Sequence, residues 1–262
     1  MLELGAVPGH PPDWSPWRTG PGSAGVVSDF DGTLAAVADD PQRAVPLPGS
    51  LDVLAALARR FALVAVVSGR PVEYLDLHLG RVPQLVLVGL YGLQRLEGGR
   101  LRVAEGARPW GPVVAGVAKT AQAVAPDGVS VEMKGLTVVL HARRRPDQLP
   151  WATQWAQDQA KATGLRAQPG KLSVEILPPI DLDKGTVIED LAGPLQALCF
   201  LGDDVGDLPA FAALSRLRAA GKSTVAVGVA SPEQPAPLAG AVDVMVDGPA
   251  GALRLLASLA AD

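Results

Sequence analysis

The sequence predicts an α/β protein with a doubly wound, mostly parallel sheet and a smaller α+β domain inserted into it. Apolar runs alternate with segments of helical periodicity from residue 25 to residue 89, which is typical of a parallel sheet with helices on both faces. The pattern changes after residue 98 and returns after residue 180. We therefore expect a core of residues 25–98 and 181–262, an inserted domain of residues 99–180, and an N-terminal arm of residues 1–24.

The first half of the core reads as three strands joined by two helices. Residues 25–28 form a short apolar run, which predicts a buried strand. Leucines recur at helical spacing in residues 50–60 and predict a helix with Ser50 as its N-cap. We then expect a strand at 61–67, a helix at 72–79 and a strand at 85–89. A βαβαβ series of this kind implies parallel strands.

The inserted domain begins at a predicted hairpin. Gly98-Gly99 lies between two short runs that predict strands, so residues 93–103 should form the hairpin. We next expect a helix at 112–124, strands at 129–133 and 136–142, a helix at 150–163 and two more strands. The βαββ-like order suggests an open-faced α+β domain that ends at Pro178-Pro179. The core should resume with a helix from Lys184, a strand at 197–201, a helix at 208–217, strands at 224–229 and 242–246, and a helix from 250.

Composition indicates a globular protein without a nucleic-acid or membrane partner. The 262 residues are 48% hydrophobic, enough for one large or two small domains, and the net charge of −4 offers no basic stripe for a phosphate backbone. The single Cys199 lies in an apolar run, so a buried thiol is expected and no disulfide framework. Because residues 1–25 lack a signal-like pattern and no long apolar run follows, we expect a cytoplasmic protein. Trp14 and Trp17 leave two readings of the arm: a flexible segment or an extended strip on the core.

Four acidic residues follow two predicted strands. Asp29 and Asp31 come directly after the first strand, two residues apart and so on one face. If held roughly 4 Å apart, they would repel by about 4 kcal/mol at an effective dielectric of about 20. A divalent cation would offset that repulsion, and carboxylate ligands suit magnesium. Asp203 and Asp207 follow the strand at 197–201 and offer further ligands at the same edge of a parallel sheet.

A lysine and a serine complete the candidate site. Lys184 could place a fixed positive charge beside a nucleophile and a phosphate, while the Ser68 hydroxyl and its loop amides could donate to phosphate oxygens. Each fragment alone has a plain structural alternative as a turn, a helix cap or a solvated charge. Their joint occurrence favours a function.

These motifs together resemble those of the haloacid dehalogenase superfamily of phosphatases. The resemblance implies a Rossmann-like core, a type C2 cap inserted between Ser68 and Lys184, and a Mg²⁺ ion. The catalytic residues it implies are Asp29, Asp31, Ser68 and Lys184. The metal ligands would be the Asp29 and Asp203 side chains, the Asp31 carbonyl, and Asp207 as an alternative. Substrate-binding residues in the core would be Gly32, Thr33, Gly69 and Arg70.

Further segments make the chain similar to the trehalose-6-phosphate phosphatase family. They are Ser68-Gly69-Arg70-Pro71, Glu132-x-Lys134, His141-x-Arg143, Gly170-Lys171-x-x-x-Glu175-x-x-Pro178 and Asp183-Lys184-Gly185. The resemblance implies hydrolysis of trehalose 6-phosphate through an aspartyl-phosphate, with Lys134 and Glu175 binding sugar hydroxyls. Cross-strand charge pairing is the alternative for those two residues.

Other functions stay open at this stage. Tyr91 and Gln94 stand where the family carries His and Glu, so the substrate could be another modified or pseudo-disaccharide phosphate. A signalling receiver domain also combines clustered acids, a Ser or Thr and a Lys, but it needs neither a second acid two residues on nor a cap. A catalytically silent sugar-binding relative is the third alternative. The small-molecule partner expected is a sugar phosphate, and the protein is expected to be a monomer or a weak homo-oligomer.

Overall fold

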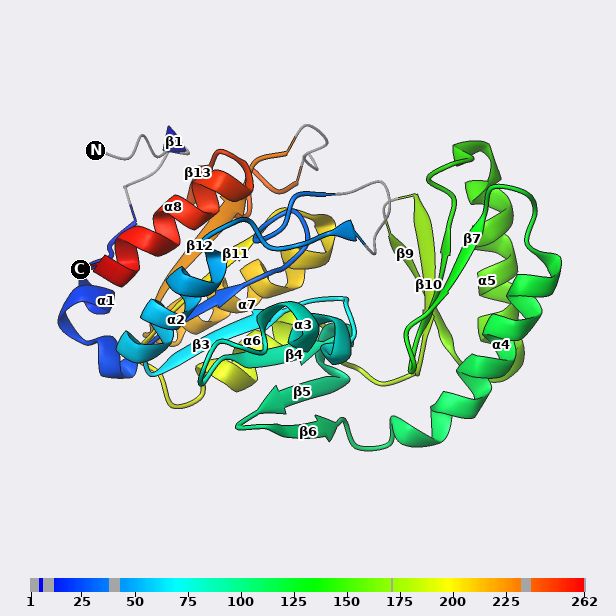
Figure 1. Cartoon of the computed structure of the whole chain (residues 1–262), viewed down its shortest axis with the longest axis horizontal. Coiled ribbons are helices and arrows are strands. Elements are labelled where there is room, and N and C mark those ends of the chain that lie inside the picture. The colour runs from blue at the N-terminus through cyan, green and yellow to red at the C-terminus, as the bar shows by residue number, and fades with distance from the viewer. Residues whose placement is uncertain (1–4, 7–11, 38–42, 171, 232–236, 262) are drawn as a thin grey trace. The chain divides into compact units, whose positions relative to one another are not determined.

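The computed structural model describes residues 5–6, 12–37, 43–170, 172–231 and 237–261, which form two compact units (Figure 1). The first unit is Met1–Leu101 with Leu182–Asp262, and the second is Arg102–Asp181. Each unit has its own sheet, one of nine strands and one of four.

The larger sheet is mostly parallel, as the sequence predicts. Its order is β1-β13-β12-β11-β2-β3-β4-β5-β6. The parallel strands are β2 (Ala24–Ser28), β3 (Leu63–Val67), β4 (Val86–Gly89), β11 (Ala197–Gly202), β12 (Ser223–Val229) and β13 (Val244–Val246). At the edges, β1 (Gly5–Ala6) runs antiparallel to β13 and β5 (Gln94–Glu97) antiparallel to β4, followed by β6 (Arg100–Val103). The predicted hairpin is therefore confirmed, but it extends the larger sheet.

Helices cover both faces of this sheet. Alternate residues of one strand enter different hydrophobic clusters: Val26 joins one cluster and Val27 the other. The first cluster is covered by α1 (Ser15–Thr19), α2 (Ser50–Arg60), α3 (Val72–Leu79) and α8 (Gly248–Ala261). The second is covered by α6 (Lys184–Ala192) and α7 (Leu208–Ala219). The predicted doubly wound α/β class is confirmed.

The strand order reverses between β2 and β11. From β2 the chain crosses through α2 to β3 on one side, whereas from β11 it crosses through α7 to β12 on the other. The loops after these two neighbouring strands consequently diverge at the carboxyl edge of the sheet. In open α/β sheets this topological switch point is where ligands bind.

The second unit is an antiparallel sheet with two helices on one face. Its elements are α4 (Gly111–Val124), β7 (Ser130–Met133), β8 (Val138–His141), α5 (Leu149–Thr163), β9 (Arg166–Gly170) and β10 (Ser173–Leu177), with strand order β7-β8-β10-β9. Val138, Leu140, Val174 and Ile176 pack with the apolar faces of both helices. The order is an αββ unit repeated, as predicted for residues 112–178. The hairpin strand that made the predicted order βαββ-like belongs to the larger sheet instead. Trp151 and Trp155 stack on each other at 6.1 Å and pack against this core.

Short 3-10 helices join several of these elements. They are η1 (Pro21–Ser23), η3 (Leu90–Gly92), η4 (Arg108–Trp110), η5 (Pro146–Gln148) and η6 (Val205–Asp207).

Two local predictions were wrong. Gly49, at φ 86°, occupies the N-cap of α2, and Ser50 is instead a buried first residue of the helix. A left-handed conformation at that position favours glycine over serine. Residues 12–23 of the predicted arm contain a short helix and a 3-10 turn, and Trp17 is fully buried with its Nε1 donating to the Gly25 carbonyl at 3.0 Å.

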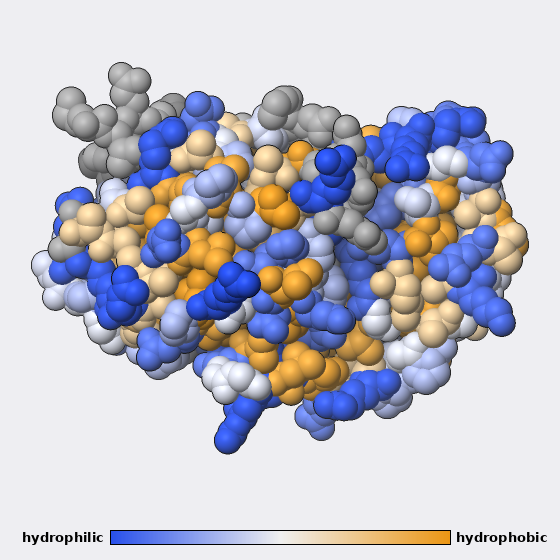
Figure 2. Space-filling view, in the orientation of Figure 1, coloured by the Kyte–Doolittle hydropathy of each residue, from blue (hydrophilic) through white to orange (hydrophobic). Residues whose placement is uncertain are grey.

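The surface mixes polar and apolar residues. On the face drawn in Figure 2, hydrophobic areas are interrupted by hydrophilic side chains. Within the part of the chain that the structure describes, we find no helix with the length and apolar character needed to cross a bilayer.

Candidate active site

Strand register brings the first and last acidic motifs together. Ser28 of β2 pairs with Leu201 of β11, and the next amide, that of Asp29, donates to the Leu201 carbonyl at 2.8 Å. Asp29 and Asp203 therefore leave the sheet side by side at the switch point, although 174 positions separate them along the chain.

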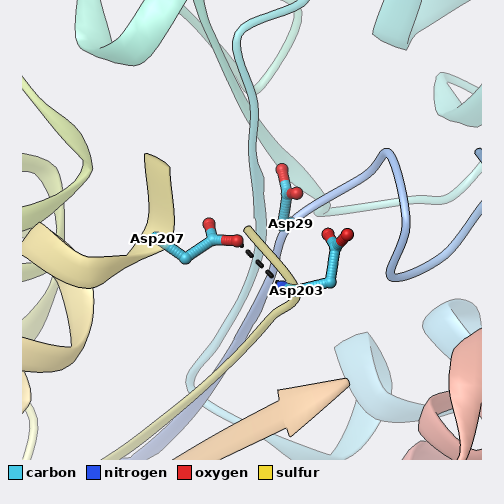
Figure 3. A group of neighbouring side chains, drawn as sticks. All are labelled: Asp29, Asp203 and Asp207. Atoms are coloured by element: carbon cyan, nitrogen blue, oxygen red, sulfur yellow. Dashed lines mark hydrogen bonds between the residues drawn. The ribbon is translucent and has the colours of Figure 1, made fainter. Parts of the chain in front are cut away.

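Three carboxylates gather at this point (Figure 3). One oxygen from each of Asp29, Asp203 and Asp207 lies within 4.8 Å of the others. All three residues are buried, with relative exposures of 5%, 7% and 0%. Buried carboxylates so close together repel strongly unless cations compensate them.

Lys184 supplies part of this compensation. Its ammonium lies 2.7 Å from Asp29 Oδ1 and 2.6 Å from Asp207 Oδ1. A capping box places it, because the Asp183 side chain accepts from the Thr186 amide at 2.8 Å and so starts α6 at Lys184. When all four groups are ionised, one ammonium leaves two of the three negative charges uncompensated.

Asp207 uses both of its oxygens to hold the surrounding structure. Oδ1 accepts from Lys184, while Oδ2 accepts from the backbone amides of Asp203 at 2.9 Å and Asp204 at 3.0 Å. These contacts fix the loop after β11. Asp29 and Asp203 are thus the better placed side chains to bind a cation.

Burial shifts the pKa values of this cluster. It raises the pKa of Asp29 well above its ordinary value, with Lys184 opposing and the other two carboxylates adding to the rise. Burial, reinforced by Asp207, raises the pKa of Asp203 to about 7. Burial alone would lower the pKa of Lys184, but Asp207 and Asp29 outweigh it and raise that pKa. Both carboxylate shifts favour the protonated forms of Asp29 and Asp203 when no further cation is present.

The donor set fits a divalent cation. The uncompensated charge equals that of such an ion, and carboxylate oxygens are its preferred ligands. Gly32 keeps Asp203 in place: at φ 76°, a Cβ there would lie 2.0 Å from Asp203 Oδ2. Glycine is thus required both by the backbone conformation and by the close approach of the carboxylate.

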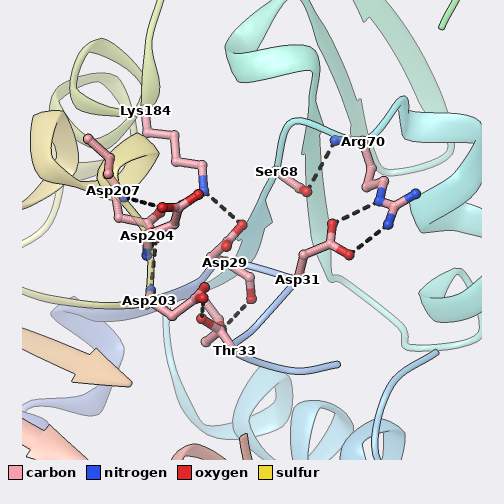
Figure 4. A network of polar contacts seen from close by, with 11 residues as sticks. Asp29, Asp31, Thr33, Ser68, Arg70, Lys184, Asp203, Asp204 and Asp207 are labelled. Atoms are coloured by element: carbon pink, nitrogen blue, oxygen red, sulfur yellow. Dashed lines mark hydrogen bonds and ion pairs between the residues drawn. The ribbon is translucent and has the colours of Figure 1, made fainter. Parts of the chain in front are cut away.

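Asp31 takes a different position from the one that its spacing suggests. Its carboxylate turns away from Asp29 and forms a pair with Arg70, whose Nη2 lies 2.7 Å from Asp31 Oδ1 (Figure 4). The expected repulsion between Asp29 and Asp31 is therefore not what requires a cation, because Arg70 already compensates Asp31. Ser68 lies next to this pair and accepts from the Arg70 amide at 3.2 Å.

Internal contacts stabilise the two loops that hold the predicted substrate-binding residues Gly32, Thr33 and Gly69. The Gly32 amide donates to the Ala35 carbonyl at 2.8 Å, and the Thr33 hydroxyl lies 3.4 Å from Asp203 Oδ1. Gly69 lies against Tyr91, whose hydroxyl oxygen would be 2.5 Å from a Cβ at that position. A role of Gly32, Thr33 and Gly69 in binding a substrate stays a prediction.

The second unit brings its two predicted site residues together. Lys134 Nζ lies 3.7 Å from Glu175 Oε1, and that same oxygen accepts from the Thr137 hydroxyl at 2.6 Å. Both charged side chains are about nine-tenths buried, at 10% and 9% exposure. His141 pairs with Glu132 on the same sheet at 2.8 Å. Lys134 and Glu175 therefore form the cross-strand charge pair, and this pairing is compatible with a role in binding a ligand.

The sequence did not indicate the structural role of two residues near Ser68. The Gln94 side chain accepts from the Val72 amide at 2.9 Å, at the first turn of α3. Tyr91, at φ 57°, donates its amide to the Ser68 carbonyl at 3.1 Å. Both depart from the family pattern, and that departure was the only signal that the sequence offered for them.

Comparison with known proteins identifies one family over most of the chain. The family model described as trehalose-phosphatase matches residues 27–238. A trehalose-phosphate phosphatase of Mycobacterium marinum is 30% identical over 207 residues, which cover 72% of this chain and 51% of that protein. The chain thus spans about half the length of the curated relatives it matches.

Solved structures share the fold. The C-terminal domain of trehalose-6-phosphate phosphatase from Candida albicans has a TM-score of 0.75 at 20% identity, with 96% of this chain and 98% of that chain covered. A haloacid dehalogenase-like hydrolase from Bacteroides thetaiotaomicron has a TM-score of 0.59 at 13% identity, with coverages of 90% and 99%.

Proposed function

Because this chain belongs to the trehalose-phosphatase family, we propose that it is a phosphoric monoester hydrolase that converts trehalose 6-phosphate to trehalose and phosphate. The observation that carries the proposal is the buried cluster of Asp29, Asp203 and Asp207 around Lys184, at the switch point of the sheet. The chemistry resides in the first unit, and the second unit acts as the cap that recognises the sugar.

The proposed reaction begins with attack of an Asp29 oxygen on phosphorus, which gives an aspartyl-phosphate. Asp31 gives a proton to the departing sugar oxygen and later accepts one from the water that hydrolyses the intermediate. Lys184 lies 2.7 Å from Asp29, where it can also stabilise charge on the phosphoryl oxygens. Ser68 is the additional donor proposed for those oxygens.

We further propose magnesium as the cofactor. The Asp29 and Asp203 side chains would hold it together with the Asp31 carbonyl, while Asp207 keeps Lys184 and the loop in position. A bound Mg²⁺ would supply charge compensation that keeps the Asp29 carboxylate ionised and stabilises the phosphoryl group. The raised pKa of Asp29 favours its protonated form, and a bound cation would oppose that shift.

Magnesium affinity is expected to fall as the pH falls below about 7. Mg²⁺ and protons compete for Asp203, whose pKa is raised to about 7, so binding should be at least about tenfold weaker at pH 6 than at pH 8. By the same linkage, the contribution of Asp203 to the stability of the metal-free protein falls as the pH rises from about 4 to about 7, because its pKa is higher in the folded state than in the unfolded state. Calorimetric titration with MgCl₂ at several pH values measures the first effect, and a pH-independent affinity would contradict it. Asp203→Asn, which removes a proposed ligand together with its titrating group, should weaken magnesium binding at every pH.

Lys134 and Glu175 are the proposed sugar-binding residues of the cap. Their ion pair is almost fully buried, and a neutral disaccharide can be held by charge-assisted hydrogen bonds from a few convergent groups. Thr137 fixes the Glu175 carboxylate for this purpose.

A substrate panel tests the proposed function. Phosphate release from trehalose 6-phosphate should exceed that from glucose 6-phosphate by about 100-fold in kcat/KM, because only the disaccharide uses the cap contacts fully. Sucrose 6-phosphate and glucosylglycerol phosphate complete the panel. A preference for one of those would support the alternative of another disaccharide-type phosphate, which the Tyr91 and Gln94 positions leave open.

Two other results would exclude hydrolysis altogether. A lasting phosphoprotein without phosphate release would favour a receiver-like role. Sugar binding with neither a phosphoprotein nor phosphate release would favour a catalytically silent relative. The cytoplasmic location and the monomeric or weakly oligomeric state stay predictions.

A further inference from the structure

The Arg70 guanidinium donates two parallel hydrogen bonds to the Asp31 carboxylate. Its Nε donates to Oδ2 at 2.8 Å and its Nη2 donates to Oδ1 at 2.7 Å. The Arg70 side chain is 8% exposed, whereas that of Asp31 is 37% exposed. A bidentate fork of this kind is the most directional charge-assisted pair that proteins make. Both Asp31 oxygens are therefore engaged, and one must be released before Asp31 can transfer a proton.

Arg70 is itself fixed at several points. Its guanidinium lies 4.6 Å from the centre of the Tyr74 ring, and the Tyr74 hydroxyl donates to the Ala44 carbonyl at 2.5 Å. The Arg70 amide donates to Ser68 Oγ at 3.2 Å, and its carbonyl accepts from the Leu90 amide at 2.9 Å. Asp31, on the more exposed side, is consequently the partner that can move.

The pair also separates Asp31 from the other acids. A fourth carboxylate near Asp29 and Asp203 would add to a cluster that already has more negative than positive charge. Figure 4 shows Asp31 directed toward Arg70 and away from the side on which Lys184 meets Asp29. The fork holds Asp31 near the reacting groups without letting it join their cluster.

We propose that Arg70 is the positioning residue for Asp31, holding the acid–base carboxylate at the edge of the site and releasing one oxygen when the substrate arrives. This inference rests on the proposed function, because it assigns the control of its proton transfer. It differs from the substrate-binding role that the sequence predicts for Arg70, since the Asp31 carboxylate already accepts both hydrogen bonds of the guanidinium fork.

The proton steps in which Asp31 takes part are balanced. As the bond from Asp29 oxygen to phosphorus forms, the bond from phosphorus to the sugar oxygen breaks, and that oxygen takes the Asp31 proton. Water then attacks phosphorus and gives a proton to the Asp31 carboxylate, and the bond to Asp29 breaks to restore its carboxylate. The Asp31 oxygen released from Arg70 takes up a proton from solvent before the first turnover, and Asp31 ends each turnover protonated and ready for the next.

The test compares two leaving groups. p-Nitrophenolate leaves without protonation, whereas a sugar alkoxide needs it. Arg70→Gln should therefore lower kcat/KM for trehalose 6-phosphate by on the order of 10 to 100-fold, and that for p-nitrophenyl phosphate by less than about threefold. Arg70→Lys, which keeps the charge but loses the fork, should lie between Arg70→Gln and wild type. Inhibition by inorganic phosphate should change by less than about twofold.

Equal losses with both substrates, together with weaker inhibition by phosphate, would overturn the inference and make Arg70 a phosphate ligand. Arg95→Gln is the matched control. Arg95 Nη1 lies 2.8 Å from Asp190 Oδ2, and this pair includes no member of the acid cluster. Thermal unfolding checks that each variant is folded, and Arg70→Lys supplies the comparison if Arg70→Gln is not. If the wild type cleaves p-nitrophenyl phosphate and another sugar phosphate but not trehalose 6-phosphate, the proposed substrate is wrong. The Arg70 variants are then compared on that other sugar phosphate and p-nitrophenyl phosphate. A wild type that cleaves neither substrate overturns both proposals.

Discussion

Asp29→Asn is expected to abolish turnover, reducing phosphate release from trehalose 6-phosphate by at least about 10⁴-fold. The amide cannot form the aspartyl-phosphate. The other nearby carboxylates have different roles: Asp207 accepts from Lys184 and two amides, Asp31 is paired with Arg70, and Asp203 is the proposed metal ligand. Phosphate release measured with saturating MgCl₂ tests this expectation.

The same variant should remain folded. Burial raises the pKa of Asp29, so its ionised form destabilises the metal-free protein, and a neutral amide removes that cost. We expect a thermal unfolding temperature at pH 8 equal to or above that of the wild type without metal. Asp190→Asn is the matched control, because Asp190 is 71% exposed and its pair with Arg95 contributes little. An Asp29→Asn protein that keeps a tenth of wild-type activity would disprove the proposed mechanism.

Lys184→Met should damage both stability and catalysis. The change leaves Asp29 and Asp207 buried without their shared cation, and removing one partner of a buried ion pair costs about 3 to 5 kcal/mol. Phosphate release should fall by about 10² to 10³-fold, because a fixed charge beside the phosphoryl group is lost. Denaturant unfolding of the metal-free protein and steady-state kinetics measure the two effects.

The stability loss should depend on pH. Asp29 and Asp203 have raised pKa values, so at pH 5.5 they take up protons and tolerate the missing ammonium better than at pH 8. Lys222→Met is the matched control: the Lys222 ammonium donates to the carbonyls of Ala192, Gly193 and Leu195, all neutral groups. The Lys222→Met variant should lose less unfolding free energy than Lys184→Met, by the same amount at both pH values, and should keep wild-type activity. Identical pH dependence in the two variants would contradict our account of Lys184.

Local patterns predicted the fold well. The helix at 72–79 and the hairpin around Gly98-Gly99 lie where the sequence placed them, because periodicity and turn glycines are local signals. The hairpin's place in the larger sheet could not be predicted. Its antiparallel pairing with β4 depends on the turn between them, where Leu90, Tyr91 and Gly92 all have a positive φ that the sequence pattern did not indicate.

The site was predictable in its residue types and less so in its pairings. Acids after two strands of a parallel sheet had to lie near one edge, which made Asp29 and Asp203 candidates. Nothing in their spacing indicated that Asp207 would accept hydrogen bonds from the loop amides, or that Asp31 would pair with Arg70 instead of joining the other acids. Those pairings depend on loop conformations after each strand, such as the left-handed Gly32.

The amino-acid sequence by itself determined which strands would form and which reactive side chains would end them, since alternation and strand termini are properties of neighbouring residues. Only the tertiary structure decided which charges meet and how deeply they are buried. Charge interaction and desolvation depend on distances between segments remote in the chain, and Asp29, Lys184 and Asp207 become one electrostatic unit only when β2, α6 and β11 pack together.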